Sequence, residues 1–85
     1  MASISLTYSS SLAYKLGDDV FVGKQQLPAR VLYIGKTKFA NGVWVGVELT
    51  RKEDRGKNSG IVRGERYFSC EKNKGLFLFK KSRNA

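Results

Sequence analysis

The fold of this chain follows most directly from residues 43–49, which read Val43-Trp44-Val45-Gly46-Val47-Glu48-Leu49. Successive side chains of a β-strand point to opposite faces of the sheet. The branched aliphatic residues at positions 43, 45, 47 and 49 therefore share one face, which we predict to be the core face. On the other face Gly46 leaves space beside the indole of Trp44. The indole points either toward a second small apolar cluster or toward solvent.

Short runs of β-branched and aromatic residues lie on both sides of this stretch, and glycines separate them. The runs are residues 20–22, 29–34, 61–62, 66–70 and 76–79. No window shows the 3.6-residue apolar period of an amphipathic helix, and the chain contains nine glycines. We therefore predict a small, glycine-rich, mostly β, antiparallel domain with little helix. Pro28 is expected just before the second run, where a missing N–H is tolerated.

The last run repeats the alternation. Leu76 and Leu78 fall on one side of the predicted strand, and Phe77 and Phe79 fall on the other. With Trp44, these aromatic residues define an apolar surface away from the aliphatic core. Such a surface is a candidate binding groove, and the alternative is a second small core built around Trp44.

The segment Gly56-Lys57-Asn58-Ser59-Gly60 places a cation and a side-chain amide between two glycines. Flanking glycines allow backbone conformations in which N–H groups converge on one point, so the loop is suited to capture a carboxylate. The alternative is a solvated turn, because Gly, Asn and Ser are common in turns for local reasons.

The composition limits the possible functions. Eighty-five residues make one domain, and the net charge of +9 attracts nucleic acid, anionic lipid headgroups or an acidic peptide. The chain has one cysteine, Cys70, and no histidine, which removes an internal disulfide and histidine-based catalysis. We expect a reducing compartment, no enzyme activity, no cofactor, no metal and no membrane-spanning segment.

Composition changes along the chain suggest three parts. Residues 1–14 are rich in serine and are predicted to form a flexible tail; the alternative is an edge strand through Ile4, Leu6 and Tyr8. Residues 15–82 form the predicted domain, and 83–85 are the basic C-terminal end. We expect Cys70 to be a small buried residue and not a nucleophile.

Tyr67-Phe68, placed among Arg63, Arg66 and Lys72, suggests an alternative function. Aromatic residues between cations stack on bases in some nucleic-acid-binding β-barrels. We keep this as the less favoured alternative, because the full signature of an RNA-recognition strand is missing. A third interpretation is a self-association domain that uses the Trp44 face.

Several segments together resemble CAP-Gly domains. They are residues 33–49, which begin Tyr33-Ile34-Gly35 and include Gly42-Val43-Trp44; the loop 56–60; residues 64–70, Gly64-Glu65-Arg66-Tyr67-Phe68-Ser69-Cys70; and residues 75–78, Gly75-Leu76-Phe77-Leu78. The resemblance covers about residues 15–82. It implies an SH3-like β-barrel that binds acidic C-terminal tails ending in an aromatic residue, Glu-Glu-Tyr or Glu-Glu-Phe. Such tails occur on α-tubulin, end-binding proteins and cytoplasmic linker proteins, so the resemblance implies a cytoplasmic, cytoskeleton-associated module.

The resemblance also implies site residues. Lys57 and Asn58 would hold the terminal carboxylate and the adjacent glutamates, while Gly56 and Gly60 would shape the loop. Ser59, in the same loop, is also a predicted peptide-binding residue. The slot for the aromatic ring would consist of Phe39, Trp44 and Phe77.

Four features depart from the family pattern. Ser59 replaces an aspartate, and the 50–55 connection is about two residues longer than usual. Pro28 lies close to where a glycine is common. Phe79 stands where a polar or basic residue is often seen, and it either extends the slot or is buried.

Overall fold

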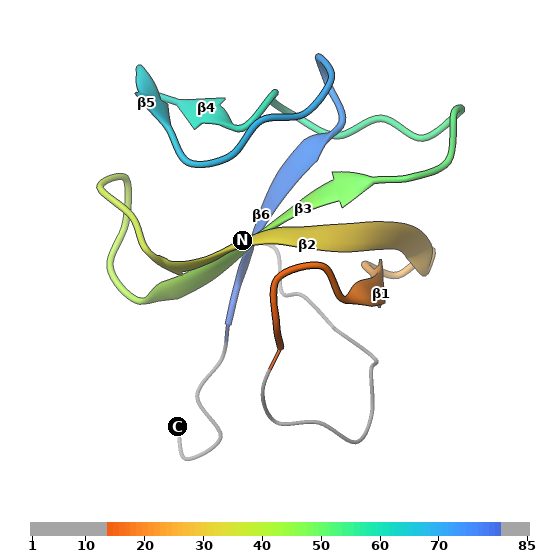
Figure 1. Ribbon diagram of the computed structural model, residues 1–85, viewed down its shortest axis with the longest axis horizontal. Coiled ribbons are helices and arrows are strands. Elements are labelled where there is room, and N and C mark those ends of the chain that lie inside the picture. The colour runs from red at the N-terminus through yellow and green to blue at the C-terminus, as the bar shows by residue number, and fades with distance from the viewer. Residues whose placement is uncertain (1–13, 81–85) are drawn as a thin grey trace.

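The computed structural model describes residues 14–80, and these form two antiparallel sheets with no helix (Figure 1). The larger sheet has the order β1-β2-β3-β6. Its strands are β1 (Asp19–Val22), β2 (Leu27–Lys36), β3 (Val43–Leu49) and β6 (Gly75–Phe79). The short strands β4 (Ile61–Val62) and β5 (Glu65–Arg66) form a separate hairpin, drawn above the larger sheet in Figure 1. The predicted fold class, a small antiparallel β domain, is confirmed.

The core lies on the predicted face of β3. Val45 and Val47 are fully buried and Leu49 is 2% exposed, whereas Val43, at the start of the strand, is only partly buried. Five further aliphatic residues complete the buried cluster: Val20, Val22, Ala29, Val31 and Leu78. Each valine or leucine of this cluster contributes about 1.5–3 kcal/mol when its side chain is removed from water. This small core therefore stabilises the packing of β1, β2, β3 and β6.

A bulge in β2 changes which face its residues occupy. Val31 pairs with Val47, but Tyr33 pairs with Gly46, so one extra residue lies between them on β2. Simple alternation would place Tyr33 on the same face as Val31. The extra residue moves Tyr33 to the Trp44 face and Ile34 to the core face, where Ile34 packs against the buried cluster.

Two expected boundaries were wrong. Pro28 lies inside β2, opposite Phe21, and its carbonyl accepts a hydrogen bond from the Thr50 N–H at 3.1 Å. The run 66–70 is a strand only at its first residue, because the chain then folds back along the Gly56–Gly60 loop. There the Tyr67 N–H donates to the Gly60 carbonyl at 2.8 Å, and the Cys70 N–H donates to the Ser59 carbonyl at 3.3 Å.

The predicted termini fall almost wholly outside the described residues. The serine-rich tail 1–14 is described only at Tyr14, and the basic end 83–85 is not described. Between residues 14 and 80 no helix has the length and apolar character needed to cross a bilayer.

Candidate functional site

Seven aromatic side chains gather on the Trp44 face of the sheet. They are Tyr33, Phe39, Trp44, Tyr67, Phe68, Phe77 and Phe79. Phe77 is central, with ring centroids 5.1 Å from Phe39, 5.3 Å from Tyr67 and 5.4 Å from Phe68. The rings meet edge-on or tilted, which is the favourable geometry for aromatic pairs. We call these seven residues the aromatic cluster.

Gly46 makes room for a ring of this cluster, but not for the ring we expected. A Cβ at position 46 would lie 2.4 Å from Cε1 of Phe68 and 3.1 Å from Cε1 of Phe77. The space above Gly46 is therefore filled by Phe68, which is 8% exposed, and the expectation that it lies open beside the indole was wrong.

Trp44 lies at the border of the cluster. Its indole N–H donates to the Asn41 carbonyl at 3.1 Å, and its ring is 5.2 Å from Phe39 and 5.3 Å from Phe79. Phe79 remains 39% exposed, so it extends the aromatic surface beside Trp44 instead of being buried. The Trp44 face is a small second core in one part and an accessible apolar surface in another. Phe68 is packed as in a small core, while Trp44 and Phe79 stay accessible.

A cavity of about 430 Å³ borders this cluster. Phe39, Trp44 and Phe77 line it together with Lys57 and Asn58, so the structure brings these five predicted residues to one place. The rest of the lining comes from Val22, Gly23 and Leu27 at the β1–β2 turn, and from Val62, Leu76 and Leu78. Lys57 and Asn58 are its polar side chains, at the border of otherwise apolar walls.

The backbone of the Gly56–Gly60 loop is already engaged. The Gly56 N–H donates to Asn73 at 2.6 Å, and the N–H groups of Lys57 and Asn58 donate to the Gly75 carbonyl at 2.7 and 3.2 Å. These three N–H groups therefore do not converge on an outside anion, contrary to our expectation. The cationic group that the loop offers is the ammonium of Lys57, which is exposed and has no ion-pair partner within residues 14–80.

Asn58 closes the turn with one end of its side chain. Its Oδ1 accepts the Gly60 N–H at 2.8 Å, while no described residue accepts a hydrogen bond from its Nδ2. The Ser59 side chain takes no part in this hydrogen bond. The bond that closes the turn is therefore kept although serine replaces the aspartate of the family pattern. The amide Nδ2 of Asn58 is thus a free donor at the edge of the cavity.

Gly56 and Gly60 are required by close approach of the backbone. A Cβ on Gly56 would lie 2.5 Å from the Gly75 carbonyl oxygen. A Cβ on Gly60 would lie 1.8 Å from the Phe68 carbonyl oxygen, and Gly60 also has a φ of +98°. Neither position accepts a side chain without movement of the backbone, so the close backbone contacts of this loop require glycine at both positions.

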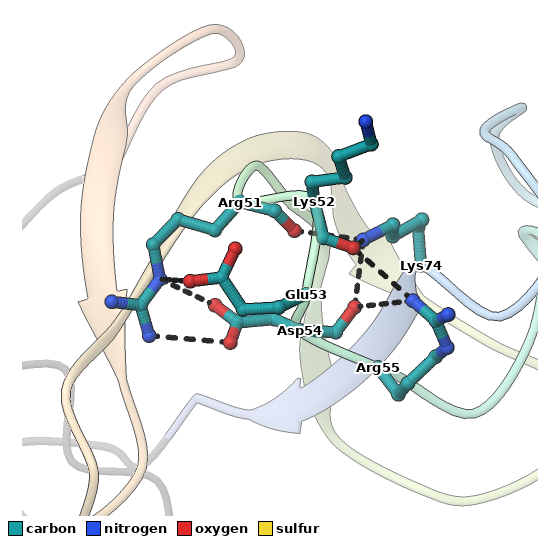
Figure 2. Close-up of polar contacts among 6 residues, drawn as sticks. All are labelled: Arg51, Lys52, Glu53, Asp54, Arg55 and Lys74. Atoms are coloured by element: carbon teal, nitrogen blue, oxygen red, sulfur yellow. Dashed lines mark hydrogen bonds and ion pairs between the residues drawn. The ribbon is translucent and has the colours of Figure 1, made fainter.

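The long charged connection before the loop is organised around one lysine that sequence reasoning missed. The ammonium of Lys74 is surrounded by the carbonyls of Arg51, Lys52 and Asp54 at 2.7, 2.9 and 2.7 Å (Figure 2). Lys74 is 9% exposed, which is unusual for a lysine. Arg55, at the end of the connection, also donates to the Lys52 and Asp54 carbonyls, at 3.2 and 3.4 Å, so two of the three carbonyls have two donors.

The carboxylate of Asp54 is paired separately from this lysine. Arg51 binds it with two hydrogen bonds, Nε to Oδ2 at 2.9 Å and Nη2 to Oδ1 at 3.2 Å. This contact raises the pKa of the Arg51 guanidinium, chiefly through the hydrogen bond to Asp54. The connection therefore enters Gly56 from a fixed direction.

Tyr67 and Phe68 do not form an open stacking surface for bases. The Tyr67 hydroxyl accepts the Lys38 N–H at 2.9 Å, and its ring packs edge-on against Phe39 and Phe77. The thiol of Cys70 is partly buried, and burial raises its pKa. Within residues 14–80, no group of three or more His, Cys, Asp or Glu side chains is arranged to hold a metal ion.

Comparison with known proteins agrees with this geometry. The family model of the CAP-Gly domain matches residues 16–82. Similar proteins are microtubule-associated protein ssm4 of Schizosaccharomyces pombe, 46% identical over 74% of this chain, and dynactin subunit 1 of Xenopus laevis, 47% identical over 75%. CAP-Gly domain-containing linker protein 3 of Homo sapiens is 47% identical over 80% of the chain.

The matched segment covers only 9%, 5% and 12% of these three relatives. The solution structure of the CAP-Gly domain in human kinesin-like protein KIF13B superimposes with a TM-score of 0.68 at 33% identity, over 94% of this chain and 78% of that one. The present chain belongs to the CAP-Gly family.

Proposed function

We propose that this domain is a non-enzymatic, peptide-binding module of the cytoplasmic cytoskeleton. Its ligands would be acidic C-terminal tails that end in an aromatic residue, Glu-Glu-Tyr or Glu-Glu-Phe, on α-tubulin, end-binding proteins or cytoplasmic linker proteins. Binding such tails would associate the domain with microtubules. The names of two relatives, a microtubule-associated protein and a CAP-Gly domain-containing linker protein, support this role.

One observation carries the proposal: an apolar cavity of about 430 Å³ has at its border an ammonium and an amide donor that no residue between 14 and 80 engages. The volume lies within the range of small-ligand sites, about 300–1,000 Å³. An aromatic ring would bury against Phe39, Trp44 and Phe77, while the terminal carboxylate would meet Lys57 and Asn58. No constellation of nucleophile, acid and base accompanies the cavity residues, which favours binding over catalysis.

The magnitudes indicate that the aromatic slot and the carboxylate contacts together supply most of the affinity, and that the lysine charge adds less than the ring. Burial of one aromatic side chain contributes about 1.5–3 kcal/mol, whereas an exposed lysine–carboxylate pair contributes about 0.2–1 kcal/mol. With the carboxylate hydrogen bonds added, we expect a dissociation constant near 1 μM, about −8 kcal/mol. The net charge of +9 would mainly raise the association rate.

Calorimetric titration with a peptide ending in Glu-Glu-Tyr tests the proposal. We expect Lys57→Ala to weaken binding about threefold to fivefold. Asn58→Asp should weaken it about tenfold, because it keeps the Oδ1 acceptor for Gly60 but replaces the free donor with a negative oxygen. Lys72→Ala removes the same charge from an exposed lysine that does not line the cavity and serves as the control.

Removal of the terminal tyrosine from the peptide should abolish most of the binding. If both site variants bind as tightly as the control variant, the assigned site is wrong. Salt-sensitive binding of a random oligonucleotide, in the absence of peptide binding, would instead favour the nucleic-acid alternative. Dimerisation at micromolar concentration that the peptide cannot reverse would favour self-association through the Trp44 face.

A further inference from the structure

The outer edge of β6 presents main-chain groups on the side away from β3. The Lys80 N–H donates to the Val43 carbonyl, and the Leu49 N–H donates to the Lys74 carbonyl, each at 2.8 Å. Both bonds join an even-numbered residue beside or within β6 to an odd-numbered residue of β3, and the register between them is unbroken. Since hydrogen bonding alternates along an antiparallel strand, the odd-numbered residues of β6 direct their N–H and C=O groups outward.

The first of these outward residues shows what the edge can do. Gly75 accepts the Lys57 N–H at 2.7 Å and donates its own N–H to the Asn58 carbonyl at 2.7 Å. The Gly56–Gly60 loop therefore pairs with the edge of β6 at Gly75, through an antiparallel bridge. The next outward residue is Phe77, and none of the described residues forms a backbone bridge with it on that side.

This unpaired edge borders the cavity. Phe77 lines the cavity wall, and Val22, Gly23 and Leu27 line it from the β1–β2 hairpin. β1 and β6 are the two edge strands of the four-stranded sheet. Residues of both strands line the cavity, so the cavity lies between the two edges of the sheet. An unpaired strand edge is a template for another strand.

We propose that the ligand binds as an added β-strand along the outer edge of β6 and exchanges main-chain hydrogen bonds with the outward-facing residues Phe77 and Phe79. This inference rests on the proposed function and specifies how the same site binds the main chain of its ligand. A terminal carboxylate near Lys57 lies at the Gly75 end of β6. The preceding ligand residues then extend toward Phe79, so the added strand runs antiparallel to β6.

Strand addition makes a prediction about the ligand that the side-chain contacts alone do not make. Alternate ligand residues point into the cavity and away from it, because side chains of a strand alternate. The main-chain bonds depend on an extended backbone and not on side-chain identity. The main-chain bonds would tolerate varied side chains ahead of the acidic-aromatic end of the ligand, provided that the ligand contains no proline at a residue paired with Phe77 or Phe79.

An N-methyl scan of the peptide tests this proposal. Each amide of a six-residue peptide ending in Glu-Glu-Tyr is methylated in turn, and the dissociation constants are measured by calorimetry. We expect losses of about tenfold at the residues opposite Phe77 and Phe79, which are two positions apart, and less than about twofold at the residue between them. The alternation is the signature of strand pairing.

Amide hydrogen exchange gives a second, independent readout. The Phe77 amide should exchange at least about tenfold more slowly when the peptide is bound. The Gly75 amide, already bonded to Asn58, is the internal reference and should change much less.

The outcomes separate the two proposals. Tight binding of the unmodified peptide, with no alternation in the N-methyl scan and unchanged exchange at Phe77, overturns strand addition and leaves the proposed function standing. Failure of the unmodified peptide to bind overturns both.

Discussion

Replacement of Lys74 by methionine tests how the long charged connection is held in place. The ammonium of Lys74 donates to three backbone carbonyls at 2.7–2.9 Å and is almost fully buried (Figure 2). Lys74→Met keeps a similar chain length but leaves these three acceptors without their shared donor. The connection would then have to hydrate its carbonyls or change conformation.

The magnitude follows from the number and type of bonds. A hydrogen bond that involves a charged group contributes about 1.5–3 kcal/mol, and three bonds to one ammonium are not additive. The methionine also removes the desolvation cost of a buried charge that contacts no carboxylate, which offsets part of the loss. We therefore expect Lys74→Met to lower the free energy of unfolding by about 2–4 kcal/mol, a large share of the 5–15 kcal/mol typical of a domain.

Urea unfolding followed by Trp44 fluorescence measures this change. Lys52→Met is the matched control, since Lys52 lies in the same connection and its ammonium points away from the carbonyls (Figure 2). The control should change stability by less than about 0.5 kcal/mol. If Lys74→Met and Lys52→Met differ by less than about 0.5 kcal/mol, Lys74 does not hold the connection as we infer.

Two further predictions concern Gly60 and Cys70. Gly60→Ala should unfold the domain or lower its free energy of unfolding by more than about 3 kcal/mol, whereas Gly64→Ala should lower it by about 1 kcal/mol. Both glycines have a positive φ, but only at Gly60 does backbone lie where a Cβ would be. Equal losses of stability in urea unfolding would contradict this. Burial raises the pKa of the Cys70 thiol, so the folded state disfavours the thiolate. The stability that Cys70 contributes is therefore fully present below the ordinary pKa of a thiol, and it is lost as the pH rises through the pKa of Cys70 in the folded state. Iodoacetamide at pH 8 should therefore modify the folded protein more slowly than the urea-unfolded chain, and Cys70→Ala should reduce the alkaline fall in stability; equal alkylation rates would be evidence against a buried thiol.

The core face and the aromatic face of the domain could be predicted from the sequence because both depend on local alternation. Residues 43–49 and 76–79 each place aliphatic and aromatic side chains on opposite sides, and the buried cluster follows that pattern. The residues around the cavity, Phe39, Trp44, Phe77, Lys57 and Asn58, were predicted from the family resemblance and do lie together. Their role in binding stays a prediction.

Other features required the tertiary structure. The bulge between Val31 and Tyr33 moves Tyr33 to the aromatic face. No local pattern in the sequence predicts this extra residue in β2. Lys74 is one of sixteen cations in the sequence, and nothing local sets it apart; folding brings its ammonium to carbonyls more than twenty residues away. The N–H groups of the Gly56–Gly60 loop looked free in sequence, yet three of them are bonded to backbone carbonyls at Asn73 and Gly75.

The sequence by itself determined which residues are apolar, which face of β3 and β6 they occupy and where the chain turns, since these depend on near neighbours. Only the tertiary structure decided which polar groups are already paired and which remain free. A backbone N–H or carbonyl is present at almost every position, and its partner depends on segments that are distant in the chain. The unpaired Lys57 ammonium and the open edge at Phe77 are therefore properties of the fold, although every residue that forms them can be read in the sequence.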